Sequence, residues 1–267
     1  MEKEDKRGIF FGVIGVLTLI VAIIGASFAY FTINASSNKN AVTVNAATVK
    51  IVYSEGDKIA MDGLIPATRD DAIQALQRGL RGDTYKVGES DITYTPCKDD
   101  NNYTVCGYYE FSLKNDGDNP VELKAYITPE QLAAAVVDEE NPENNKPAEI
   151  GFRNLNYILF DRTAIKGTTP LDLANNGTEV YAGVVPFDAD NNLYDVNGFG
   201  ILGEDINKTL SIAGKGTETK KYRLFIWLNN TLDNSNDLEQ GATFKGTIHV
   251  DLPGTEGKIH GVVEYYL

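Results

Sequence analysis

Oxygen-bearing side chains suited to a hard cation are concentrated in one loop of the sequence. Asp188, Asp190, Asn192 and Asp195 follow one another at short intervals between residues 188 and 198. Carboxylate and amide oxygens at alternating positions of a loop are the ligands that calcium prefers. The loop is not an EF-hand, because it lacks the turn glycine and the terminal acid of that motif. We consider calcium as a candidate ligand here, with an Asx-rich turn as the alternative interpretation.

The sequence contains no group of residues with the spacing of a catalytic site. His249 and His260, the two histidines, are too far apart for an HExxH zinc motif, and the sequence has no GxSxG elbow and no phosphate-binding loop. His249 stands in an alternating stretch that is typical of a strand. Carboxylates are abundant, but abundance alone does not indicate acid–base catalysis. We therefore predict that the protein is not an enzyme and has no other cofactor.

Cys97 and Cys106 are the only cysteines of the chain, and they flank a polar turn between two β-prone stretches. Such a turn can bring the two sulfur atoms together across a hairpin. A metal pair is the alternative, but Cys-x8-Cys with only two histidines in the chain does not complete a zinc site. The sequence predicts a structural disulfide, which requires an oxidising compartment.

The N-terminal segment carries the features of an export signal. Residues 9–31 contain no charged side chain and follow Lys6 and Arg7. An apolar run of this length can cross a bilayer as a helix, and basic residues before it keep the N-terminus inside. We therefore expect the rest of the chain to lie outside the cytoplasmic membrane, at the cell surface or in the extracellular space.

Three interpretations of this apolar segment remain open. Small residues at Ser27 and Ala29 precede a candidate cleavage between Ala29 and Tyr30, which makes residues 1–29 a signal peptide. Without cleavage, the same residues form a transmembrane anchor. Gly8 before the apolar run is also typical of type IV-like prepilins, although the acidic residue usual at the fifth mature position is absent.

Overall composition excludes one class of partner. The chain has 267 residues, a formal net charge of −14 and a hydrophobic content of 42%. This excess of negative charge repels the phosphate backbone of nucleic acids, so nucleic acid is not an expected ligand. The apolar content is sufficient for a packed core, and the acidity is typical of a soluble exported protein.

The exported part, residues 41–267, is dominated by short β-prone stretches between Gly, Asn and Asp turns. The expected strands are near 41–53, 91–95, 105–113, 121–127, 155–160, 179–185, 208–213, 221–228, 242–252 and 258–266. This pattern predicts a mainly β domain, an antiparallel sandwich or jelly roll.

Two insertions with short helices are expected within the β domain, near 61–90 and 128–150. Residues 66–81 have apolar side chains at helical spacing, and Gly82 suits the end of that helix. Thr128-Pro129-Glu130-Gln131 matches a capping box and predicts a second helix over residues 132–137.

Several stretches resemble the TasA/camelysin family of exported proteins from Gram-positive biofilm matrices. A small-aromatic-Ala junction is followed by an aromatic residue, a polar linker and a β-branched strand, and two internal stretches also match the family pattern. These stretches are 26–32, 42–51, 111–117 with 121–127, and 222–228 with 240–248.

The resemblance implies a jelly-roll sandwich, processing by a dedicated signal peptidase and assembly into extracellular fibres. In such fibres the freed N-terminal segment, here residues 30–40, completes the sheet of the next subunit. The donor strand would begin with Tyr30, Phe31 and Ile33, and Val42 and Val44 would continue it. A metalloprotease activity has been attributed to camelysin-like proteins, but the sequence has no paired histidines for the metal.

Two other functions remain open beside a self-associating fibre protein. Residues 9–31, if uncleaved, would make the chain a membrane-anchored extracellular binding module, with residues 30–40 as a tether. The prepilin-like start favours a type IV-like pilin instead.

Overall fold

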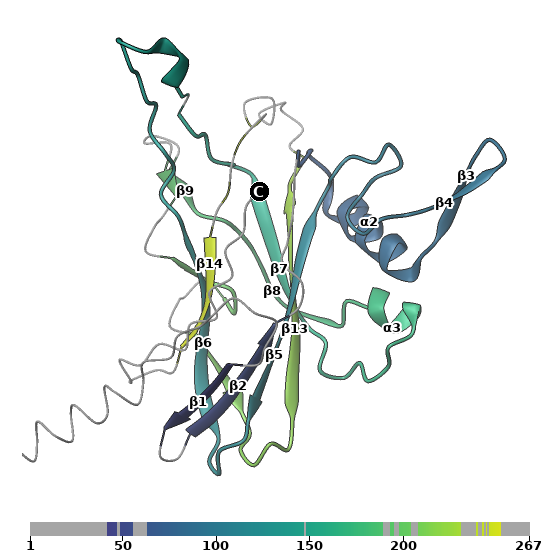
Figure 1. Cartoon of the computed structure of the whole chain (residues 1–267). Coiled ribbons are helices and arrows are strands. Elements are labelled where there is room, and N and C mark those ends of the chain that lie inside the picture. Colours follow the sequence, from purple (N-terminus) through teal and green to yellow (C-terminus); the bar gives the residue numbers. More distant parts are fainter. Residues whose placement is uncertain are drawn as a thin grey trace, which may run out of the picture.

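Figure 1 shows the computed structural model of the chain, which is mainly β, with antiparallel sheets and two α-helices in its described part. This confirms the predicted mainly β, antiparallel class. The residues that the structure describes are 42–46, 49–55, 63–146, 148–188, 193–194, 198–203, 208–230, 239, 242, 244 and 246–251. The predicted N-terminal apolar helix and the strand near 258–266 lie outside these ranges.

The larger sheet contains six strands, all joined in antiparallel pairs. In spatial order they are β1 (Val42–Ala46), β2 (Val49–Glu55), β5 (Gly107–Asn115), β13 (Thr219–Leu228), β7 (Leu155–Asp161) and β8 (Thr178–Val184). β5 and β13 lie at its centre, with Phe111 opposite Tyr222. The β-branched stretch at 41–53 thus forms two strands of one hairpin, β1 and β2.

The smaller sheet is built around β6 (Val121–Pro129). β14 (Gly246–Asp251) pairs with one side of β6 over most of its length. β11 (Phe199–Gly200) and β12 (Thr209–Ile212) also pair with β6. Some of the β6 residues involved pair with β14 as well, so β11 and β12 lie end to end on the side of β6 opposite β14. Two further hairpins are β3 (Thr84–Val87) with β4 (Ser90–Thr93) and β9 (Phe187–Asp188) with β10 (Leu193–Tyr194).

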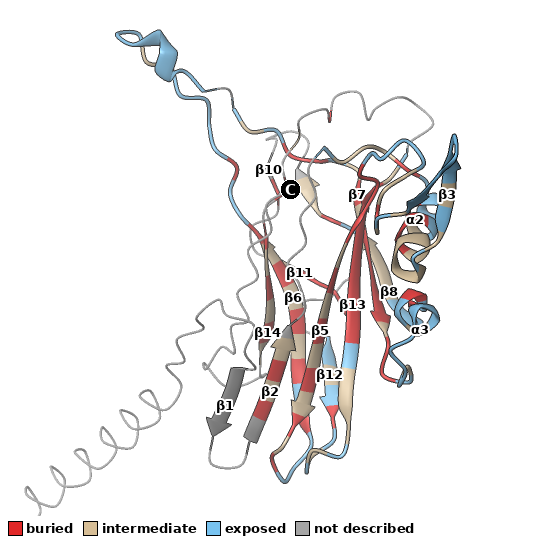
Figure 2. Ribbon diagram, turned by 45° about the vertical axis from the view of Figure 1, so that its right-hand side comes forward, coloured by how far each residue is buried: buried red, intermediate tan, exposed pale blue. Residues whose placement is uncertain are grey.

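The two sheets share one apolar core, so they form two layers of a sandwich. Alternate residues of β6, from Val121 to Ile127, are buried, and they belong to the same cluster as alternate residues of β5, β7 and β13. Figure 2 shows this buried layer running along the length of the strands. The alternation of apolar and polar residues in β6 therefore exists because only one face of that sheet meets the core.

A second apolar cluster covers part of the outer face of the larger sheet. Helix α2 (Arg69–Arg81) buries Ala72, Ala75 and Leu76 against Phe225 and neighbouring residues of β13 and β7. Both faces of β13 are therefore covered, which explains why all of its residues from 222 to 228 are buried rather than every second one. In both views α2, α3 and the β3–β4 hairpin lie on this side of the sheet.

Helix α2 confirms the helix expected at 66–81. Its N-cap is Thr68, whose side chain accepts a hydrogen bond from the backbone N–H of Asp71 at 3.2 Å. Its C-cap is Gly82, with a φ of 71° in the left-handed region that glycine adopts without strain.

The prediction of a helix at residues 132–137 is wrong. β6 continues through Pro129, which lies opposite Gly246 of β14, and residues 130–137 form no helix. The next described element is the 3-10 turn η1 (Pro142–Asn144). Of residues 132–137 only Leu132 is buried, so a helix here would have no apolar face to pack, and an isolated helix of six residues is not stable.

The second helix is α3 (Pro170–Ala174). It begins with the same kind of signature, Thr169-Pro-Leu-Asp172, and both hydrogen bonds of a capping box are formed. Unlike residues 132–137, α3 is held against the sheet by two arginines described below. Within the described ranges, no helix has the length and apolar character needed to cross a bilayer.

Candidate functional site

Most residues of the predicted processing, assembly and calcium sites lie outside the part of the chain that is described. This applies to the cleavage residues Ala29 and Tyr30, to the donor residues Phe31 and Ile33, and to the loop residues Asp190, Asn192 and Asp195. Asp188 is the last residue of β9, where it pairs with Leu193 of β10. The described residues contain no group of three or more His, Cys, Asp or Glu side chains that could hold a metal ion.

Val42 and Val44 lie on β1, the first strand of the larger sheet. They pair with Tyr53 and Ile51 of β2 in the same chain. Donation of these two residues to a neighbour would therefore require β1 to leave β2. Among the described strands β1 has no second neighbour, so it is the edge strand of the larger sheet as described.

The disulfide between Cys97 and Cys106 is present, as predicted. Both cysteines are buried in the cluster that joins α2 to the larger sheet. The bond therefore fixes the loop that follows the β3–β4 hairpin to the start of β5. A buried disulfide is consistent with a protein that matures in an oxidising compartment.

A charge cluster with two buried arginines lies on the outer face of the larger sheet, beside α3. Arg223 of β13 is 1% exposed, and its Nε and Nη2 atoms donate to Oε1 of Glu110 on β5 at 2.9 and 2.7 Å. Its Nη1 atom donates to Oδ1 of Asn176 at 2.6 Å. Burial lowers the pKa of Arg223, and the carboxylate of Glu110 partly offsets this effect.

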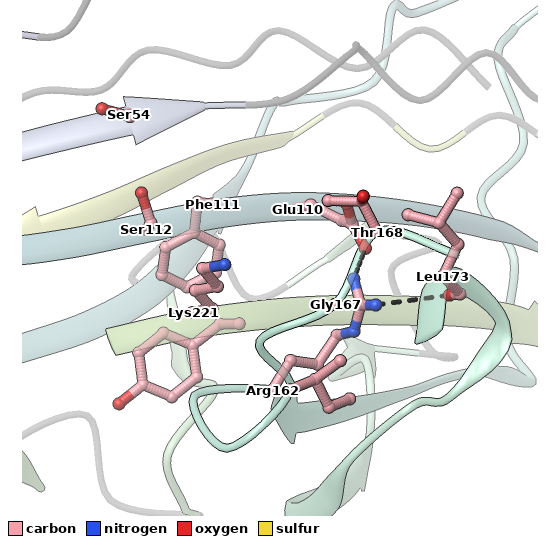
Figure 3. Close-up of a pocket in the computed structure, with 11 residues that line it drawn as sticks. Ser54, Glu110, Phe111, Ser112, Arg162, Gly167, Thr168, Leu173 and Lys221 are labelled. Carbon is pink, nitrogen blue, oxygen red and sulfur yellow. Dashed lines mark hydrogen bonds and ion pairs between the residues drawn. The ribbon is translucent and has the colours of Figure 1, made fainter. Parts of the chain in front are cut away.

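Arg162 brings a second guanidinium to the same carboxylate. Its Nη1 atom forms an ion pair with Oε1 of Glu110, as Figure 3 shows. Its Nε and Nη2 atoms donate to the carbonyl oxygens of Asn175 and Asp172 at 3.0 and 2.8 Å. Arg223 also donates to the carbonyl oxygen of Leu173 at 2.7 Å.

These contacts place two positive charges at the C-terminal end of α3. Carbonyl groups in the last turn of a helix have no partner within the helix, and cations at this end are favourable. Arg162 and Arg223 therefore cap a helix of only five residues and fasten it to the sheet. This is a structural role that explains the burial of both arginines.

Beside this cluster is a pocket of about 290 Å³, which we call the basic pocket. Ser54 of β2, Ser112 of β5 and Lys221 of β13 form its wall on the sheet, each directly opposite the next in the strand register. Residues from the loop after β7 and from α3 form the other side. The lining residues are Ser54, Glu110, Phe111, Ser112, Arg162, Ile165, Gly167, Thr168, Leu173, Lys221 and Tyr222.

Part of the polar surface of the basic pocket is unused by the described chain. The hydroxyl groups of Ser54, Ser112 and Thr168 form no hydrogen bond to any described residue. Lys221 is exposed and has no carboxylate partner in the same part of the chain. Figure 3 shows Ser54, Ser112 and Lys221, which lie on three adjacent strands. Their two hydroxyl groups and one ammonium group have no partner among the described residues.

A second pocket of about 310 Å³ lies between α2 and the disulfide loop, and its acidic residues have internal roles. Oδ1 of Asp99 accepts hydrogen bonds from the backbone N–H groups of Asn101 and Tyr103 at 2.9 and 2.8 Å. Asp100 forms an ion pair with Arg78 at 2.8 Å. These carboxylates fold the loop and do not define a ligand site.

No protein-family model matches the chain, and no curated protein or solved structure is significantly similar to it. The resemblance to the TasA/camelysin family therefore depends on the short sequence stretches quoted above.

The charge cluster was missed in the sequence, although one signal for it is present. Arg223 interrupts the apolar run 222–228, and a charge within a fully buried strand requires a partner. Its partner Glu110 is 113 positions away, on a strand whose neighbours the sequence pattern does not specify. The sequence therefore indicates a buried arginine at position 223, but it does not indicate which residues surround it.

Proposed function

We propose that the protein is an exported, non-enzymatic structural component of the cell surface or extracellular matrix. In this proposal the sandwich has jelly-roll topology, and the chains assemble into fibres when residues 30–40 of one subunit add a strand to the next. The observation that supports it best is the position of β1 at the edge of the larger sheet, within the part of the chain that is described.

The place of β1 matters because the proposed donor segment directly precedes it in the chain. β1 pairs with β2 on one side only, at least among the described strands. Residues before Val42 can therefore extend toward a neighbour while the hairpin β1–β2 stays in its own sheet. In this form the donor strand consists of residues 30–40, and Val42 and Val44 anchor it.

An acceptor for such a strand is available at more than one edge. β8 and β14 each pair with a single neighbour among the described strands. An extended segment can add to an edge of this kind through its backbone groups, while alternate side chains fill pockets on the acceptor. β8 also exposes Val180 and Val184, which are 40% and 55% accessible.

N-terminal sequencing of the secreted protein tests how the chain is processed. We expect the mature chain to begin at Tyr30. A start at Ile9 would contradict this and support a type IV-like pilin, and an intact Met1 would support a membrane-anchored module. The basic pocket favours a binding module as the second candidate function, since a ligand site has no necessary role in a fibre.

Assembly is tested with substitutions confined to the proposed donor strand. We expect the triple variant Tyr30→Ser, Phe31→Ser and Ile33→Ser to remain monomeric in sedimentation velocity under conditions in which the wild-type protein forms fibres. The apolar side chains that would fill the acceptor pockets are then absent.

The matched control changes polar linker residues of the same segment. The variant Asn34→Ser, Asn38→Ser and Asn40→Ser should assemble like the wild-type protein, because these side chains supply no apolar contact. Fibres of normal length from the Tyr30, Phe31 and Ile33 variant would rule out strand donation by this segment.

A further inference from the structure

We propose that the basic pocket binds an anionic sugar, with the sugar carboxylate on Lys221 and ring hydroxyl groups on Ser54, Ser112 and Thr168. This inference does not depend on fibre assembly. It starts from the charge of the pocket. Among the lining residues, Arg162 and Lys221 carry positive charges and Glu110 a negative one, so the lining has a net charge of +1. Outside the lining, Arg223, which is bound to Glu110, and Asp172, which lies next to Gly167, add one charge of each sign.

A net positive pocket is unexpected from the composition of this chain, whose formal charge is −14. The arginines are already bound to Glu110 and to carbonyl groups of α3, so they supply charge and not free donors. Lys221 is different, because its ammonium group is exposed and unpaired within the described residues. An anion that enters the pocket would therefore contact Lys221 directly.

The shape of the polar row distinguishes a sugar from a simple anion. Ser54, Ser112 and Lys221 stand on three adjacent strands in register. Neighbouring strands lie about 4.8 Å apart, so the row is roughly 10 Å long. A phosphate or acetate ion would contact only one end of it. A pyranose ring with an exocyclic carboxylate can contact the ammonium and the hydroxyl groups together.

The volume and the remaining walls agree with one sugar ring. At about 290 Å³ the pocket is at the lower limit for small-molecule sites. Ile165 and Leu173 provide an apolar wall opposite the polar row, and Leu173 is 40% exposed. Gly167 also lines the pocket, and it packs closely against α3, because a Cβ atom there would lie 2.0 Å from Oδ2 of Asp172.

The test is a titration of the full exported protein with D-glucuronate, D-glucose, acetate and inorganic phosphate, followed by saturation-transfer NMR. The method works for monomers and for fibres, so the result is independent of the assembly proposal. We expect glucuronate to bind with a Kd on the order of 1 mM, as its size allows. Glucose, acetate and phosphate should each bind at least tenfold more weakly.

Two lysines on adjacent positions of β13 provide a matched pair of variants. Lys221→Gln removes the unpaired charge and should weaken glucuronate binding at least tenfold. Lys220→Gln makes the same change on the opposite face of the strand, where Lys220 pairs with Glu218 at 3.0 Å, and should change the affinity less than twofold. Ser112→Ala should weaken glucuronate binding roughly threefold and leave acetate unaffected.

Three results would overturn the proposal. The first is the absence of saturable glucuronate binding, and the second is an equal loss of binding in Lys220→Gln and Lys221→Gln. The third is phosphate or acetate binding as tightly as glucuronate, which would show a site for small anions in place of a sugar site.

Discussion

Among single residues, Glu110 stands out because its carboxylate pairs with two arginines. One oxygen atom of its carboxylate faces two guanidinium groups, and one of these belongs to a side chain that is 1% exposed. A buried charge is tolerated only when an opposite charge and hydrogen bonds replace the water it has lost. Arg223 satisfies this condition through Glu110, Asn176 and Leu173.

Replacing Glu110 should expose this dependence. Glu110→Gln removes the negative charge and leaves two cations facing each other, so we expect a loss of roughly 2–3 kcal/mol in the free energy of unfolding. This is less than the 3–5 kcal/mol typical of fully buried pairs, because water reaches the partly exposed Glu110. Urea denaturation measures the effect. Glu130→Gln, which changes an exposed carboxylate at the end of β6, should unfold like the wild-type protein.

Glu239 predicts a pH dependence of stability. It is 3% exposed, its Oε1 atom accepts a hydrogen bond from Asn154 at 2.5 Å, and burial raises the pKa of its carboxyl group. Because the folded pKa is raised, the folded state binds the proton more tightly than the unfolded state does. The group therefore favours folding at low pH, and this contribution is lost as pH rises through the two pKa values.

Glu239→Gln imitates the neutral carboxyl group at every pH. We expect the variant to melt at a higher temperature than the wild-type protein at pH 8 and at nearly the same temperature at pH 4. Glu143→Gln, an exposed carboxylate of η1, should produce no such divergence between the two pH values. A higher melting temperature of Glu239→Gln at pH 4 but not at pH 8 would contradict a raised pKa of Glu239 in the folded protein.

At the scale of secondary-structure elements, local signals decided helices only where tertiary packing supported them. Thr68 and Gly82 cap α2, and its apolar face lies on β13 and β7. The signature at residues 128–131 is equally good in local terms, but the sheet extends through it. Helix propensity and caps contribute about 1 kcal/mol each, which is less than the burial of one or two large apolar side chains.

Gly79 in α2 tests whether packing outweighs helix propensity. Alanine normally stabilises a helix interior by about 1 kcal/mol relative to glycine. A Cβ atom at position 79 would, however, lie 2.1 Å from the backbone nitrogen of Pro96. We expect Gly79→Ala to destabilise the protein by about 1–3 kcal/mol in urea denaturation, since α2 must move away from the disulfide loop. Gln74→Ala is the control, and a gain of stability in Gly79→Ala would contradict the packing argument.

At the scale of the whole molecule, net charge opposes self-association. Every subunit carries a formal charge of −14, so subunits that approach each other repel over the screening length of the solution. That length falls from about 30 Å at 0.01 M salt to about 10 Å at 0.1 M. The proposed fibre must form against this repulsion through backbone hydrogen bonds and apolar contacts, which salt affects little.

Fibre assembly should therefore be faster at 150 mM than at 10 mM sodium chloride, as measured by light scattering. Binding of glucuronate to the basic pocket should respond in the opposite direction, because salt screens an attraction there. Assembly that slows as salt is added would indicate that subunits associate through opposite charges and not through a donated strand. Calcium chloride at equal ionic strength is a useful comparison, since an additional effect would point to the loop at 188–195.

The mainly β class, helix α2 with its C-terminal glycine and the disulfide between Cys97 and Cys106 could be predicted from the sequence. These features depend on residues close together in the chain, whose preferences are readable locally. Three features depend on tertiary packing instead: the non-helical conformation of residues 132–137, the burial of both faces of β13, and the ion pairs of Glu110 with Arg162 and Arg223. Strand neighbours are selected by the burial of whole sheet faces, and this selection brings together residues that are far apart in the sequence.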